Sequence, residues 1–97
     1  MLYLHRKQKQ MEMETQQFIT ADWLREQGFE ETDFDNRHFR KIINERTCNL
    51  HQNRISGAWT IAVFDTELRR QFNMFNYAYS GIRYQGELMR MAKTFFN

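Results

Sequence analysis

The chain has 97 residues, of which 41% are hydrophobic and 15% aromatic, and its net charge is +2. This composition is typical of a globular chain rather than a disordered one, and the length suits one domain with a modest core. No stretch approaches the roughly 20 apolar residues of a membrane helix, and the first residues lack the order of a secretory signal. With Cys48 as its single cysteine, the chain cannot form an internal disulfide. We therefore expect a cytoplasmic protein without membrane contact, and a buried, inert thiol.

Charge is distributed unevenly along the chain. Residues 1–10 carry three basic residues and no acid, residues 11–35 carry eight acids and one arginine, and residues 36–97 carry ten basic residues and four acids. A basic body of this kind could attract nucleic acid or an acidic protein surface. The alternative is a solvated surface over which the acidic segment folds back.

The first clear element is a short helix. Residues 1–17 are polar and predict only a tail or a frayed helix, whereas residues 18–97 read as a single domain. Thr20 has the side chain of an N-cap residue, and Gly28 suits the left-handed position that ends a helix. The pattern therefore predicts a helix over Thr20–Gln27.

Three strand candidates follow an acidic loop at residues 30–37. They are His38–Ile43, Thr47–His51 and Ala58–Phe64. Their apolar residues alternate, and the short gaps between them favour antiparallel hairpins, with a turn at Asn53–Gly57. A polar connection is expected at Asp65–Arg70.

The aromatic run Gln71–Ser80 predicts a fourth strand with apolar side chains on both faces. Alternation places one set on the face that we expect to be buried: Phe72, Met74 and Ala78. It places three aromatic side chains on the opposite face: Phe75, Tyr77 and Tyr79. Such a strand is either covered on both sides or offers one face to a partner.

The chain ends in a second predicted helix, longer than the first, over Ile82–Phe96. Ser80 and Gly81 break the strand pattern, and an apolar stripe at helical spacing follows: Tyr84, Leu88, Met91, Ala92 and Phe95. The expected fold is α+β, an antiparallel sheet of three to four strands with the short N-terminal helix and the longer C-terminal helix packed on one face.

Two segments resemble a group of small uncharacterised bacterial proteins, often encoded in prophages and other mobile elements. The segments are T-x-x-W-L-x-x-x-G-F at Thr20–Phe29 and I-x-Y-x-x-x-L at Ile82–Leu88, about a quarter of the chain. Those proteins commonly carry a His and a Leu-Gln pair in their last helix, and this chain has neither in the matching region. The resemblance implies a fold and a genomic context, and it carries no activity.

No residue set specifies a reaction, a metal or a cofactor. The candidate metal ligands are His5, His38, Cys48 and His51, and a strand would place Cys48 and His51 on opposite faces. No apolar pocket flanks the paired carboxylates of the acidic loop to raise their pKa values, which indicates a solvated, ionised loop. The acids concerned are Glu30, Glu31, Asp33 and Asp35. We therefore expect no enzyme activity, no cofactor, no metal site and no small-molecule substrate.

The composition favours a binding protein instead. Aromatic residues, Met and Arg are enriched at protein interfaces, so a protein partner or a homo-oligomer is the leading expectation. The alternative is a nucleic-acid-binding module, in which aromatic rings stack on bases and arginines meet phosphates. Both hypotheses use the same candidate residues: Arg69, Arg70, Phe75, Tyr77, Tyr79 and Arg83.

Overall fold

The computed structural model describes residues 17–72 and 77–96. Its first helix, α2 (Ala21–Glu26), has the start and the stop that its sequence predicts. The Thr20 hydroxyl accepts a hydrogen bond from a first-turn N–H at 3.1 Å. After the helix, Gly28 has a φ of +91°, and the Phe29 N–H donates to the Leu24 carbonyl at 3.0 Å. These bonds satisfy backbone groups that a helix end leaves unpaired.

Five strands form one antiparallel sheet in the order β1-β2-β3-β4-β5. Their bounds are β1 Glu30–Glu31, β2 His38–Ile43, β3 Arg46–Gln52, β4 Trp59–Asp65 and β5 Tyr77–Ile82. Each strand pairs with the next one along the chain, so the sheet is a simple meander. The turn between β3 and β4 contains Gly57 at a φ of +76°, which agrees with the predicted turn.

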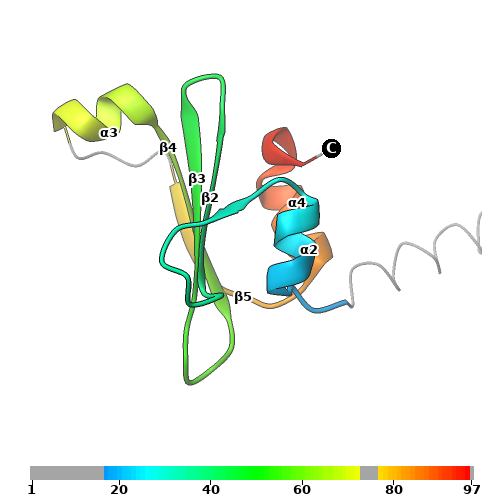
Figure 1. Ribbon diagram of the computed structural model, residues 1–97. Coiled ribbons are helices and arrows are strands. Elements are labelled where there is room, and N and C mark those ends of the chain that lie inside the picture. Colours follow the sequence, from blue (N-terminus) through cyan, green and yellow to red (C-terminus); the bar gives the residue numbers. More distant parts are fainter. Residues whose placement is uncertain (1–16, 73–76, 97) are drawn as a thin grey trace, which may run out of the picture.

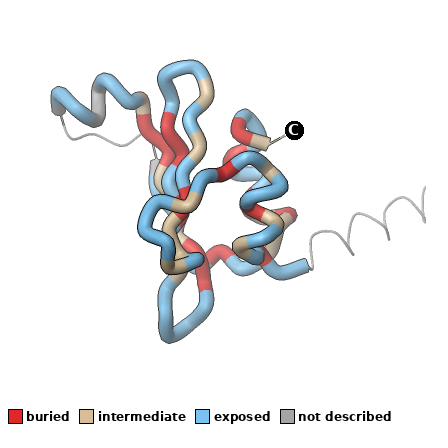
Figure 2. The backbone as a smooth tube through the Cα atoms, viewed as in Figure 1, coloured by how far each residue is buried: buried red, intermediate tan, exposed pale blue. Residues whose placement is uncertain are grey.

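The helices α2 and α4 (Gln85–Met91) cover one face of this sheet, with the 3-10 turn η1 (Lys93–Phe95) beside them (Figure 1). The buried stretches of the central strands and of both helices face one another across this layer (Figure 2). One row of the core runs across three strands, because Phe39 pairs with Leu50 and Leu50 pairs with Ile61. Leu24 and Leu88, both fully buried, contribute to the same core from the helix side.

The α+β class and the antiparallel sheet are thus confirmed, but three details of the prediction are wrong. The sheet has five strands, because Glu30–Glu31 pairs with β2 at the edge and extends the meander. The polar connection is instead a helix, α3 (Thr66–Phe72). It contains good helix formers, and Glu67 pairs with Arg70 at 2.8 Å and with Gln71 at 2.7 Å.

The C-terminal helix is also shorter than predicted. Ile82 belongs to β5, where it pairs with Trp59, and α4 begins only after Tyr84. Gly81 does not break the strand; its φ of +79° accompanies a register shift in the β4–β5 ladder, as a β-bulge requires. The helix ends at Met91, and Ala92 turns the chain out of the helical region with a φ of −126°.

Candidate functional site

The face of the sheet opposite α2 and α4 is the candidate functional surface. Side chains alternate along a strand, so the positions between the core rows point to this other side. We call this surface the open face; its residues are Glu30, His38, Arg40, Ile42, Thr47, Asn49, His51, Thr60, Ala62, Phe64 and Ala78. Figure 1 shows that α3 projects on this side, at the end where the β2–β3 hairpin turns.

Helix α3 meets one corner of the open face. The hydroxyl groups of Thr47 and Thr66 share a hydrogen bond of 2.7 Å, and the Thr66 N–H donates to the Glu45 carbonyl at 2.8 Å. Thr47 is 3% exposed and Phe64 is 7% exposed, so this corner is closed. Ile42 pairs with Thr47 in the sheet and yet remains 54% exposed.

The surface around Ile42 is hollowed on two sides. One hollow of about 490 Å³ runs along the open face from His38, Arg40 and His51 to Thr66. A second hollow of about 540 Å³ is lined by Ile42, Glu45, Thr66 and Glu67. Ile42 and Thr66 line both hollows, so Ile42 forms an apolar ridge between them.

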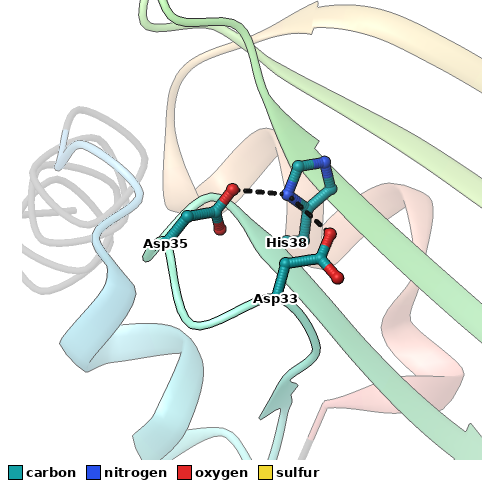
Figure 3. A group of neighbouring side chains, drawn as sticks. All are labelled: Asp33, Asp35 and His38. Carbon is teal, nitrogen blue, oxygen red and sulfur yellow. Dashed lines mark hydrogen bonds and ion pairs between the residues drawn. The ribbon is translucent and has the colours of Figure 1, made fainter.

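The acidic loop contributes a side-chain cluster at the end of this surface where His38 lies. His38 Nδ1 lies 2.8 Å from an oxygen of Asp35 and 3.2 Å from an oxygen of Asp33 (Figure 3). The backbone N–H of Arg37 holds the pKa of the Asp35 carboxyl below its usual value, and His38 adds to this effect. The His38 ring also stacks on His51, with centroids 4.4 Å apart.

This cluster also has the donor atoms of a metal site. One atom from each of Asp33, Asp35 and His38 lies within 4.8 Å of the others, and imidazole with carboxylate suits several divalent ions. Nδ1 lies within hydrogen-bond reach of both carboxylates, so the three groups contact one another directly. The contacts therefore support a role for the cluster in fixing the loop against β2. The contacts of Asp33 and Asp35 with His38 are of the kind expected if the acidic segment folds back over the rest of the chain.

Cys48 lies in the core, on the opposite face of β3 from His51, as the sequence predicts. Burial raises the pKa of its thiol to about 12, although the nearby Lys41 opposes the shift. A thiol that stays protonated is a weak nucleophile. Within the described part of the chain, Cys48 and the two histidines thus cannot act together as a catalytic set.

Of the six residues predicted as a site, the structure describes the side chains of Arg70, Tyr79 and Arg83, and it gives Arg70 and Arg83 different partners. Arg70 lies in α3 and pairs with Glu67, whereas Arg83 follows β5 and donates to the Ser56 carbonyl at 2.8 Å. Arg70 precedes β5 in the chain and Arg83 follows it. Arg69 also belongs to α3, and Phe75 lies outside the described residues.

The two tyrosines belong to β5, but the predicted faces of this strand are wrong. Tyr79 pairs with the core residue Ile61 and so lies on the helix side, at the sheet edge and 52% exposed. Ala78, predicted to be buried, pairs with Ala62 on the open face. The backbone of Tyr77 pairs with that of Val63. Phe72 belongs to α3 and not to the strand, and Met74 lies outside the described residues. The register of β5 is set by its pairing with β4.

Sequence reasoning missed the open face of β2 and β3. The available signal was the alternation in His38–Ile43, which separates Arg40 and Ile42 from Phe39 and Lys41. It also treated the acidic loop and His38 separately, although they adjoin in the chain.

Among the described residues, no helix is long and apolar enough to cross a membrane. Comparisons of the chain with protein-family models, with curated proteins and with solved structures each find no match.

Proposed function

We propose that this protein is a small non-catalytic binding protein, and that the open face is the surface with which it contacts another protein. One observation carries the proposal: Ile42 is 54% exposed on a hollowed sheet face that helices α2 and α4 leave uncovered. The uncovered face of an antiparallel sheet is normally polar. Here Ile42 is an exposed apolar side chain, with the exposed Arg40 on its own strand and the exposed Glu45 in the turn that follows.

This layout has the anatomy of a protein interface. Interfaces combine an apolar centre with a polar rim, and arginine is enriched in them. Ile42 supplies the centre, and Arg40 and Glu45 supply opposite charges at the rim. The resemblance of two segments to prophage-type proteins extends the proposal to a phage or mobile element acting on a host component.

Nucleic acid is the second candidate, and one observation favours it. His38, Arg40 and His51 lie together at one end of the open face, where they could meet phosphates. Asp33 and Asp35 stand beside His38 and weaken this positive region. A protein partner is therefore the better-supported proposal.

The test is a pull-down from a bacterial lysate with three tagged proteins, in nuclease-treated and untreated arms. The first is the native chain and the second carries Ile42→Glu. The third carries Ile55→Glu, a matched control because Ile55 is 97% exposed in the β3–β4 turn. We expect one protein, resistant to nuclease, to be retained by the native chain and by the control but lost with Ile42→Glu.

Two results would contradict this proposal. Equal retention by all three proteins would show that the open face is not the contact surface. Retention that disappears in the nuclease arm, together with salt-dependent binding of single-stranded oligonucleotides, would favour nucleic acid instead.

A further inference from the structure

We infer that the acidic loop between β1 and β2 is a second contact site of this protein. In this site Phe34 enters an apolar pocket on a partner protein, and Asp33 and Asp35 meet basic side chains at the edge of that pocket. The inference goes beyond the proposed function, because it uses the loop and not the exposed Ile42 of the open face. It stands on an exposed aromatic ring that the fold holds in an unfavourable backbone conformation.

The side chain of Phe34 lies almost fully in solvent, with 90% of its surface exposed. An enclosed aromatic side chain buries roughly 150–250 Å² and dominates the energetics of many interfaces. Single exposed apolar side chains are nevertheless common on protein surfaces, so exposure alone does not make a contact site. The backbone at this position supplies the further observation.

Phe34 occupies a backbone conformation that large side chains rarely adopt. Its φ is +56°, and Asn36, two residues later, has a φ of +61°. Asparagine and glycine are the usual residues in this region, whereas a bulky side chain there is an outlier. Strain of this kind clusters at binding and active sites. The conformation costs stability at Phe34, and a contact between the exposed ring and a partner would explain why the ring is there.

Contacts to β2 fix the backbone on both sides of Phe34. The carboxylate of Asp35 accepts a hydrogen bond from the Arg37 N–H at 2.8 Å. Asp33 and Asp35, the two neighbours of Phe34 in the chain, also converge on Nδ1 of His38 (Figure 3). The ring is therefore carried by a segment whose two ends are held.

A second set of bonds ties the loop to α2 and β1. The Asn36 N–H donates to the carboxylate of Glu31, and the Arg25 guanidinium donates to the side-chain oxygen of Asn36. Arg25 also lies 3.3 Å from the Glu31 carboxylate. A loop that is held in this way presents its ring in one place, and such preorganisation lowers the entropy that is lost on binding.

Two of the acids in the loop lie beside arginines. Residues 30–37 contain four acids and one arginine. Glu30 pairs with Arg40 in the sheet, and Glu31 forms the ion pair with Arg25. The acids without such a neighbour are the two that flank the ring.

These two carboxylates select the kind of partner. Asp33 and Asp35 are 61% and 31% exposed, and among the described residues their ion pairs are with His38 alone. Carboxylates at this position repel the anionic phosphates of nucleic acids and of lipid headgroups. A protein pocket with Lys or Arg at its edge instead offers the ring an apolar enclosure and the carboxylates complementary charge.

The first test asks whether the ring has a structural role. Phe34→Asn removes the ring and supplies a side chain that tolerates the positive φ. Because the ring lies almost fully in solvent, the urea midpoint of this variant should equal or exceed that of the native chain. A midpoint lower by more than about 0.5 M would show that the ring stabilises the fold, and the inference would fall.

The second test places the photo-crosslinking residue benzoylphenylalanine at position 34 and, as a matched control, at position 55. Ile55 is 97% exposed in another turn and has an arginine rather than acids beside it. After irradiation in a bacterial lysate, we expect position 34 to give one protein product that position 55 does not give. Mass spectrometry should map the contact to an apolar site next to Lys or Arg. The yield should fall at least about fivefold when the salt is raised to about 0.5 M, and likewise when Asp33→Asn and Asp35→Asn are combined.

Several outcomes would overturn the inference. They are the absence of a discrete product from position 34, the same products from both positions, a contact edged by acidic residues, and a product that is nucleic acid or lipid. If position 34 gives no product but the lysate still yields a protein that depends on Ile42, only this inference fails. If capture does not depend on Ile42 either, the proposed function fails as well.

Discussion

Replacing Lys41 with methionine should destabilise the fold by removing one ammonium group that joins three elements. Lys41 lies on the helix side of β2, and its Nζ donates to the carbonyls of Gln27 and Phe95, each at 2.6 Å. Gln27 ends α2 and Phe95 ends η1, so both acceptors lie at helix C-termini, where a cation is favoured. Methionine keeps much of the aliphatic stem and removes only the charge and its donors.

The two hydrogen bonds set the size of the effect. A hydrogen bond from a charged group contributes about 1.5–3 kcal/mol. Because Lys41 is only half-buried, solvent screens part of this interaction, and the lower end of the range applies to each bond. We expect Lys41→Met to lower the free energy of unfolding by about 3 kcal/mol, a large share of the roughly 5–15 kcal/mol available to a domain of this length.

Urea unfolding followed by circular dichroism measures this loss. With a slope of about 1–1.5 kcal/mol per molar urea, the midpoint should fall by roughly 2–3 M. Lys93→Met is the matched control, because Lys93 is exposed in η1, and its midpoint should move by less than about 0.5 M. If the two variants lose equal stability, Lys41 does not hold the helices to the sheet and the reasoning fails.

Three further outcomes depend on single positions. Gly28→Ala should lower the free energy of unfolding by about 1–2 kcal/mol, and by more than Gly57→Ala does. Both glycines have positive φ, but of the two only Gly28 has a neighbour that an added Cβ would meet, Lys41 Nζ at 3.3 Å. Equal losses of stability in urea titrations of the two variants would exclude that contact. Burial raises the pKa of Cys48 to about 12, so its thiol should resist iodoacetamide in the folded protein at about pH 8. The thiol should react once urea unfolds the protein. Rapid labelling of the folded protein would show instead that the thiol is accessible. The pKa of Asp35 is lowered by folding, so its contribution to stability is present above pH 3.8 and is lost as the pH falls through the folded value. Asp35→Asn should therefore flatten the acid side of the stability curve, and an unchanged acid side would mean that its contacts add no stability.

Local sequence was sufficient where local interactions decide the structure. The caps at Thr20 and Gly28 act within one turn of α2, so the residues themselves predict where that helix starts and stops. Alternation predicted β2 with its observed bounds, His38–Ile43, because one of its faces carries the buried Phe39 and the half-buried Lys41 and Ile43.

Prediction failed where two local patterns compete. The aromatic run from Gln71 suggested a strand, but Thr66–Phe72 carries strong helix formers and a pair of contacts from Glu67, and the helix prevails there. Pairing with β4 then decides which face each residue of β5 occupies. That pairing is a contact between segments, and periodicity within one segment cannot supply its register.

The sequence by itself determined that the chain forms an antiparallel α+β domain, where α2 begins and ends, and that Cys48 and His51 lie on opposite faces. Only the tertiary structure decided which face of the sheet the helices cover. Lys41 shows the physical reason: a charged residue on the core side of β2 is tolerated because its acceptors lie 14 and 54 residues away in the chain. Once those helix ends are in place over Lys41, Ile42 is left on the other side, and the open face follows from that arrangement.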